Sequence, residues 1–352
     1  MSSDIVRLTQ FSHGAGCGCK IAPDILSRIL ASPDKENVAA PFPSLLIGHQ
    51  TRDDAAAVRL NGDYALLSTT DFFMPIVDDP YDFGRIAATN AISDIYAMGG
   101  TPLLAVAILG WPISQLSADI ANRVVQGGRD VCQSLGFPLA GGHSIDCPEP
   151  IFGLAVSGTA LHQNIKRNDG GKVGDRLILT KPLGIGIHTT AEKHGKLRPE
   201  HVGQATAVMC RANDVGAQLG QIDGVNALTD VTGFGLAGHL LEMCEGAHLA
   251  AIIDMSSIPE LPALDYYIGQ GCVPGGTERN RLATDNRLPG LSLRDQTILF
   301  DPQTSGGLLI ATTEDALPEV TRLLVQNDLS SAVIGEIVAA GIDSPRILLS
   351  QT

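Results

Sequence analysis

Short apolar runs and apolar residues at helical spacing alternate along this chain. The first runs predict strands at Leu45–Ile47, Ala57–Leu60 and Tyr64–Ser68. Asn61-Gly62 separates the last two, and this dipeptide favours a β-hairpin. The first folded part of the chain is therefore expected to begin with antiparallel strands.

Further along, helices and strands continue to alternate. A helix from Asp82 to Met98 is expected, with Asp82 as its N-cap and Gly99-Gly100 as its end. On this helix Asn90 and Asp94 fall on one polar side. Other helices are predicted at Pro23–Ala31, Ser117–Leu135 and Pro199–Leu219, and other strands at Leu103–Leu109, Ile151–Leu161, Arg176–Thr180 and up to Asp230. The alternation indicates an α/β protein with mixed sheets.

The segment His162–Gly174 is polar and rich in glycine, asparagine and lysine, so we place a domain boundary there. The predicted domains are residues 1–161, with an N-terminal arm of about residues 1–44, and residues 172–352. Each half contains an aspartate after a predicted strand, Asp71 and Asp230, and a Gly-Gly pair before one. Two similar halves remain an open alternative, because this match is too short to establish a repeat.

Charge and cysteine content narrow the class of protein. The chain has 38 acidic and 24 basic residues and a formal charge of −14, which opposes broad binding to nucleic acids or anionic membranes. Seven cysteines and no apolar signal core near Met1 indicate a reducing, cytoplasmic setting. The longest apolar run, Pro102–Ile113, falls short of the roughly 20 residues of a membrane span, so a soluble protein is expected.

The segment Ser12–Lys20, SHGAGCGCK, carries the most reactive side chains. Its alternating glycines predict a mobile loop rather than a helix or strand. Lys20 stands three residues after Cys17, and a nearby ammonium lowers the pKa of a thiol. Cys17 is therefore a candidate nucleophile or metal ligand. A zinc site using Cys17, Cys19 and His13 is the competing interpretation, although no second closely spaced pair completes a tetrahedron.

Four aspartates come from separate predicted elements: Asp54, Asp71, Asp94 and Asp230. Each alone is most simply a solvated acid. Together they offer only oxygen ligands, which select Mg²⁺ over zinc, and their number suits more than one ion or an ion cluster that clamps a polyphosphate.

Two glycine-rich segments are candidate phosphate sites. Leu139–Ser144 is interpreted as a strand exit whose backbone N–H groups could bind an anion, and Val231–Gly238 as the glycine-rich opening of a helix. Val231–Gly238 only approximates the spacing of a dinucleotide-binding pattern, and Ser12–Lys20 does not match Walker A.

Seven blocks of the sequence resemble the signature blocks of the selenophosphate synthetase family, in that family's order. They are HGAGCGCK at His13–Lys20, TRDDAAAV at Thr51–Val58, Ser68–Gly100, LAGGHSI at Leu139–Ile145, LTDVTGFGLAGH at Leu228–His239, PGGTERN at Pro274–Asn280 and DPQTSGGLL at Asp301–Leu309. The resemblance implies the two-domain fold of the aminoimidazole ribonucleotide synthetase superfamily, with a mobile N-terminal arm. It also implies a homodimer whose first domains form a shared barrel, and the conversion of ATP, selenide and water to selenophosphate, AMP and phosphate.

The resemblance further implies roles for single residues. Cys17 and Lys20 match catalytic positions, and Asp54, Asp94 and Asp230 match magnesium ligands. The positions that match nucleotide contacts are Lys20, Thr51, Arg52, Asp53, Asp71, Asp94, Gly142, His143 and Ser144. Expected partners are ATP, selenide and a second copy of the chain, with a selenide-delivering protein as a further candidate and no nucleic acid or membrane.

Two alternatives follow from the same residues. A sister enzyme of the superfamily, such as a thiamine-monophosphate kinase or a hydrogenase-maturation dehydratase, would share the carboxylates but is not expected to carry the Cys-Gly-Cys-Lys arm. A thiol-based selenium or metal carrier would use the arm but leaves the four aspartates unexplained.

Overall fold

The computed structural model describes residues 6–21, 25, 28–29, 42–48, 52–284, 288, 290–341 and 346–350. Of the predicted helix Pro23–Ala31, the described residues Ile25, Arg28 and Ile29 are helical. Thr51 lies outside the described residues.

The first six strands form one sheet in the order β1-β2-β3-β6-β4-β5. Neighbouring strands are antiparallel except for β4 and β5, which are parallel. The predicted hairpin is confirmed, with Arg59 paired to Ala65 and Gly62 in the left-handed region between them. The strands are β1 Leu45–Ile47, β2 Ala56–Arg59, β3 Tyr64–Phe73, β4 Thr101–Trp111, β5 Leu139–Asp146 and β6 Ile151–Leu161.

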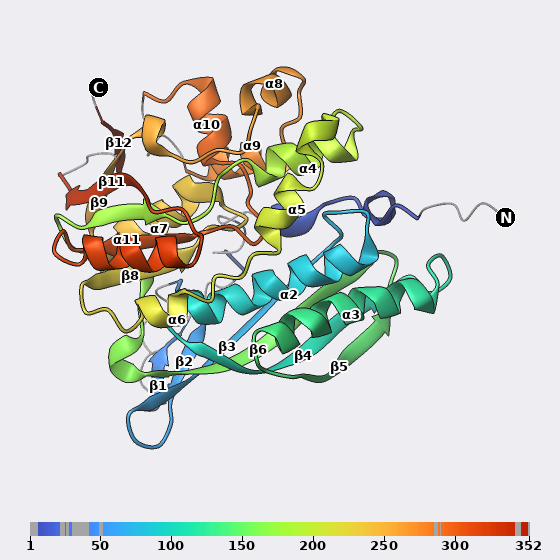
Figure 1. The fold of residues 1–352 in the computed structure, drawn as a ribbon, viewed down its shortest axis with the longest axis horizontal. Coiled ribbons are helices and arrows are strands. Elements are labelled where there is room, and N and C mark those ends of the chain that lie inside the picture. The colour runs from blue at the N-terminus through green and yellow to red at the C-terminus, as the bar shows by residue number, and fades with distance from the viewer. Residues whose placement is uncertain are drawn as a thin grey trace.

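Two long helices, α2 (Pro80–Ala97) and α3 (Ala118–Ser134), lie side by side over this sheet (Figure 1). The N-cap of α2 is Asp79 rather than the predicted Asp82. The Asp79 carboxylate accepts hydrogen bonds from the backbone N–H groups of Tyr81 and Asp82, and Pro80 fits the first helical position because it needs no N–H partner there.

The contact between α2 and α3 requires glycine. A Cβ atom at Gly127 of α3 would lie 2.1 Å from the carbonyl oxygen of Tyr81 in α2, and one at Gly84 would lie 1.9 Å from the carbonyl oxygen of Val124. The two helix backbones therefore approach each other more closely than any side chain would allow.

We expect Gly127→Ala to lower the free energy of unfolding by about 3 kcal/mol, because the added methyl group must push the helices apart. Urea unfolding followed by circular dichroism measures this change. Gly269→Ala, near the end of a surface helix with no atom within 4 Å of the added Cβ, is the control and should change stability by less than about 1 kcal/mol. Equal stability of the two variants would contradict the close helix contact.

The remaining strands form a second six-stranded sheet in the order β12-β9-β11-β7-β10-β8, antiparallel except between β12 and β9. Its strands are β7 Arg176–Leu179, β8 Val225–Asp230, β9 Leu249–Ile253, β10 Leu308–Thr312, β11 Ala332–Ala339 and β12 Ile347–Leu349. The accompanying helices are α4 Ile185–Lys193, α5 Gln204–Met209, α6 Gly216–Leu219, α7 Gly235–Ala247, α8 Leu264–Gly269, α9 Gly275–Ala283, α10 Leu293–Leu299 and α11 Leu317–Gln326.

The predicted single helix Pro199–Leu219 is wrong. The segment consists of a 3₁₀ turn at Pro199–His201, then α5 and α6. Gly203 adopts a left-handed φ of 81° before α5, and the buried Asn213 between α5 and α6 donates hydrogen bonds to Ser93 and the Gly306 carbonyl. Both features interrupt helical hydrogen bonding.

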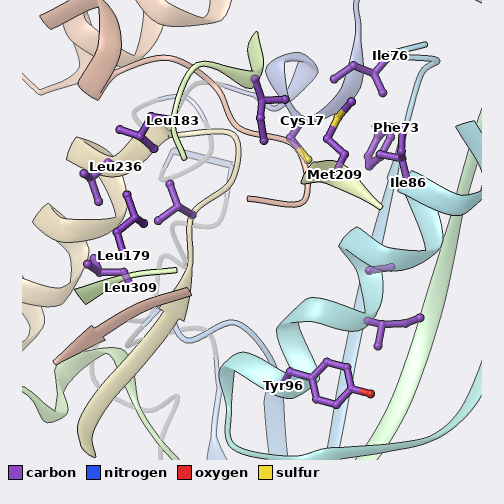
Figure 2. Packing of buried hydrophobic residues seen from close by; sticks show 14 of the residues in the cluster. Cys17, Phe73, Ile76, Ile86, Tyr96, Leu179, Leu183, Met209, Leu236 and Leu309 are labelled. Carbon is purple, nitrogen blue, oxygen red and sulfur yellow. The ribbon is translucent and has the colours of Figure 1, made fainter. Parts of the chain in front are cut away.

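One apolar cluster runs through both halves of the molecule. Figure 2 shows Phe73 and Ile86 of the first half on one side, Leu179 and Leu236 of the second half on the other, and Cys17 between them. The arm that carries Cys17 therefore lies at the junction of the two sheets. Within the described residues, no helix is long and apolar enough to cross a membrane.

Candidate active site

Three carboxylates meet at the junction of the two halves. Asp54 precedes β2, Asp94 lies on α2 and Asp230 ends β8, and one oxygen of each lies within 4.8 Å of the others. Asp54 Oδ2 and Asp230 Oδ2 are buried and have no hydrogen-bond partner. Buried, unpaired carboxylate oxygens require a cation or a proton, and an oxygen-only ligand set fits Mg²⁺.

The three aspartates destabilise one another as anions. Burial, followed by repulsion from Asp230, raises the pKa of both Asp54 and Asp94 well above the ordinary range, and burial also raises the pKa of Asp230. Two hydroxyl groups partly compensate: Thr229 donates to Asp54 at 3.0 Å and Thr69 donates to Asp94 at 2.5 Å. The site is therefore organised to receive positive charge.

Asp71 and Lys20 border this trio. Asp71 lies within β3, which continues to Phe73, and not after the strand end where the sequence predicted it. Lys20 Nζ is 3.6 Å from Asp71 Oδ2. Asp71 is the main reason that the pKa of Lys20 is raised, so the ammonium stays charged at neutral pH beside the carboxylates.

The arm is docked against both halves. Gly16 N–H donates to the Met74 carbonyl at 3.0 Å, and Cys17 N–H donates to Thr304 Oγ1 at 3.0 Å. Arg279 of α9 donates to the Gly18 carbonyl at 2.7 Å. Residues Gly16–Cys19 form a 3₁₀ turn in place of the expected irregular loop. These contacts hold Cys17 next to the carboxylates.

Cys17 is a buried thiol in this position. It is 1% exposed, and its Sγ donates to Asn90 Oδ1 at 3.3 Å. Burial and the nearby Asp71 raise the pKa of the thiol well above its usual range and outweigh the lowering by Lys20. The predicted lowering of this pKa is therefore wrong for the docked arm.

Zinc finds no support among the described side chains. Their group of three potential metal ligands is the aspartate trio, which contains neither Cys17 nor His13. His13 is exposed, with Nδ1 2.9 Å from the Glu149 carboxylate. The Cys19 side chain lies outside the description.

The remaining described residues that were predicted to contact the nucleotide fall in two places. Arg52, with a left-handed φ of 56°, and Asp53, which accepts from the backbone N–H of Asn168 at 2.8 Å, directly precede Asp54. Gly142, His143 and Ser144 instead lie in the edge strand β5, paired with β4, so they form a strand and not the predicted turn. Two strands separate β5 from the β3 strand of Asp71.

Four further residues take part in the site without having been singled out as functional from the sequence. Asn90 contacts Cys17, Thr304 and Ser305 bind the arm and Asn90, and Arg279 binds the Gly18 carbonyl. A partial signal for Asn90 was present in the sequence, because this residue shares the polar side of its helix with Asp94. Arg279, Thr304 and Ser305 lie in the blocks PGGTERN and DPQTSGGLL.

Glu242 is an ionisable residue beside the site. It lines a small pocket together with Arg52 and Phe234. Burial raises the pKa of Glu242 to about 7, although Arg52 Nη1 lies only 3.8 Å from its carboxylate. Burial also lowers the pKa of the neighbouring His239 to about 3, so this histidine is neutral near pH 7.

The raised pKa of Glu242 predicts a pH-dependent stability. A carboxyl whose pKa is higher in the folded than in the unfolded protein stabilises the fold at low pH, and this contribution disappears as the pH rises from about 4.5 to about 7. We expect the wild type to lose at most about 3 kcal/mol of its free energy of unfolding over this pH interval. Glu242→Gln should not show this loss. Urea unfolding at pH 5 and pH 8 measures it. The exposed Glu319→Gln is the control, and parallel pH curves for Glu242→Gln and wild type would refute the assignment.

The chain matches two sequence models of one family. Residues 52–160 match the N-terminal domain of AIR synthase related proteins, and residues 172–347 match the C-terminal domain. A thiamine monophosphate kinase structure from Aquifex aeolicus is 17% identical, covers 93% of this chain and 94% of its own, and superposes with a TM-score of 0.63, which supports the fold.

Curated relatives define the family more narrowly. A selenide, water dikinase of Shewanella sp. (strain MR-7) is 57% identical over 96% of this chain and 95% of its own length. That of Yersinia pseudotuberculosis serotype I (strain IP32953) is 55% identical over 99% of both chains. With both domains of the family matched and this identity over nearly the whole length, the chain belongs to the AIR synthase related family and, within it, to the selenide, water dikinases.

Proposed function

We propose that this enzyme converts ATP, selenide and water to selenophosphate, AMP and phosphate at the junction of its two sheets. The observation that carries the location is the convergence of Asp54, Asp94 and Asp230 beside Lys20 and a docked Cys17. This set offers oxygen ligands for a divalent ion and a fixed ammonium, both of which serve phosphoryl transfer, and it places a thiol beside them.

Asp54, Asp94 and Asp230 would hold Mg²⁺, and we expect more than one ion when ATP is bound. Bound Mg²⁺ supplies Lewis-acid neutralisation of the phosphate oxygens. The Lys20 ammonium adds positive charge where the transferred phosphoryl group develops negative charge. Selenide attacks the γ-phosphorus and ADP leaves, and water then splits ADP into AMP and phosphate. The buried position of Cys17 supports a role for the arm in excluding water during the first transfer.

We propose that the arm opens to admit ATP and closes over it. Its docking rests on separate polar contacts that can break, in addition to the burial of Cys17. They are hydrogen bonds of Thr9, Gly16, Cys17 and Gly18 and ion pairs of Arg7, His13 and Lys20. Hydrogen exchange of residues 12–20 should slow when a non-hydrolysable ATP analogue and Mg²⁺ are added. Unchanged exchange would argue against closure.

A homodimer follows as part of the proposal. Phe72, Leu103 and Ile145 project apolar side chains from the first sheet into solvent, each about half exposed. Gly142–Ser144 lie three strand spacings, or about 14 Å, from β3 of the same chain. We therefore propose that the partner's copy of β5 contacts the nucleotide. Sedimentation at twice the chain mass of 36.9 kDa supports this dimer, and a monomer would refute it.

The cytoplasm is the proposed location, consistent with the described cysteines, none of which forms a disulfide. A selenide-delivering protein remains a proposed partner. The sister-enzyme alternative is set aside by the relatives' identity, and the carrier alternative leaves the aspartate trio without a role.

Phosphorus NMR under anaerobic conditions tests the function. The purified protein with ATP, Mg²⁺ and selenide should give selenophosphate, AMP and phosphate, and Cys17→Ser should give no selenophosphate. Cys19→Ser should be milder, and equal loss from both variants would favour a two-thiol site. Conversion of ATP to ADP alone, or binding without turnover, would refute the proposed reaction.

A further inference from the structure

Asn90 is a completely buried amide at the centre of the site. Its Oδ1 accepts two hydrogen bonds, from Cys17 Sγ at 3.3 Å and from the Ser305 backbone N–H at 2.7 Å. Its Nδ2 donates to Asp71 Oδ2 at 2.6 Å. One side chain thus connects the arm, the first sheet and the second half of the molecule.

The neighbours of Asn90 fix which way its amide faces. The Ser305 N–H can only donate, and the side chain that faces Nδ2 is the acceptor Asp71. A flipped amide would place a donor against the N–H and an oxygen against the carboxylate. Oδ1 must therefore face Cys17, so the sulfur at that position is held as an S–H donor.

Two of the three hydrogen-bond partners of Asn90, Asp71 and Ser305, are held in place by further contacts. Asp71 Oδ2 also faces Lys20 Nζ at 3.6 Å. Ser305 adopts a left-handed φ of 51°, and its carbonyl accepts from the buried Lys181 Nζ at 2.9 Å. Contacts to the Lys20 ammonium and to a strained loop of the second half therefore help to fix the position of the Asn90 amide.

We propose that Asn90 is a positioning residue for phosphoryl transfer: it holds the Cys17 sulfur as a thiol in the docked arm and aligns Asp71 with Lys20. This inference rests on the proposed function. The docking of Cys17 and the alignment of the Lys20 charge then depend on the same amide, so the closed arm has a single position relative to the site. The proposed role of Asn90 involves no proton transfer, because the proton stays on the Cys17 sulfur.

The test compares alkylation of single cysteines in the full chain without nucleotide. Iodoacetamide labelling followed by peptide mass spectrometry reports the rate at Cys17. Removal of one buried hydrogen bond should accelerate labelling of Cys17 about tenfold in Asn90→Ala. Cys132 and Cys244, buried in the two halves, are internal controls and should keep their wild-type rates.

Steady-state kinetics provides the second readout. Asn90→Ala should lower kcat at least about tenfold and change KM for ATP less than about threefold, because the amide aligns groups without holding the nucleotide. Asn213→Ala is the matched control, since Asn213 is a buried amide at the same junction that bonds to Ser93 and Gly306 and not to the arm. It should leave Cys17 labelling unchanged.

Three results would overturn the proposal: wild-type labelling of Cys17 in Asn90→Ala, equal acceleration at Cys132 and Cys244, or the same acceleration in Asn213→Ala. If Asn90→Ala does not fold, Asn90→Asp keeps the shape and the acceptor oxygens but loses the donor to Asp71. That variant should lower kcat at least tenfold with little change in labelling, and an unchanged kcat would contradict the proposal. Failure of the wild type to form selenophosphate would refute the reaction alone, because the labelling comparison needs no turnover.

Discussion

Asp54→Asn is expected to lower selenophosphate formation at least about a thousandfold and, at the same time, to stabilise the metal-free protein. The carboxylate lies within 4.8 Å of Asp94 and Asp230 and has a buried oxygen without a partner. An amide removes one of three mutually repelling charges but also removes a metal ligand. Loss of activity with a gain in stability is not the result of simple unfolding.

Thermal unfolding in EDTA measures the stability without metal, and unfolding in Mg²⁺ then measures the stabilisation that the metal adds. We expect Asn at position 54 to add about 1–2 kcal/mol without metal and to abolish most of the stabilisation that Mg²⁺ gives the wild type. Asp63→Asn, at an exposed acid in the β2–β3 loop, is the control and should leave activity and the Mg²⁺ response unchanged. A destabilised Asp54→Asn that still responds to Mg²⁺ would show that the trio is not the metal site.

Local signals predicted much of the fold. β1, β6, β7 and α3 begin and end within a residue or so of their expected bounds, because the apolar runs and their Gly or Pro flanks are strong there. The prediction of a single helix at residues 199–219 is wrong because of a tertiary contact. Its residues favour a helix, but Asn213 turns inward to bond Ser93 and Gly306, and this contact between distant segments has no local signature.

The aspartates of the candidate site were predictable from the sequence, but the electrostatics of the site was not. Asp54, Asp94 and Asp230 were singled out from the sequence as candidate metal ligands before the resemblance gave them the same role, and the structure brings their oxygens together. The spacing to Lys20 predicted a lowered pKa for the Cys17 thiol, whereas docking buries the thiol and raises its pKa. Burial depends on Met74, Thr304 and Arg279, which are far away in the sequence.

Lys20→Met is the second variant with a large expected effect. Lys20 carries its charge beside Asp71, whose proximity raises the pKa of the ammonium, so no change of pH near neutrality removes this charge. Methionine keeps much of the length and apolar stem of the side chain but not the charge. Asp71 then loses its ion-pair partner, and in the proposed reaction the transferred phosphoryl oxygens lose one of their cations.

We expect single-turnover selenophosphate formation to fall about a hundred- to a thousandfold in Lys20→Met, with ATP binding weakened about tenfold or less, because a charge that acts on the transition state affects rate more than binding. Lys20→Arg, the charge-preserving control, should keep more activity than Lys20→Met but less than wild type, since its planar head does not fit a site built around a single ammonium. Quenched-flow assays and equilibrium ATP titration separate the two effects. A loss confined to ATP binding would make Lys20 a nucleotide anchor, and its position beside Cys17 and Asp71 would then serve binding alone.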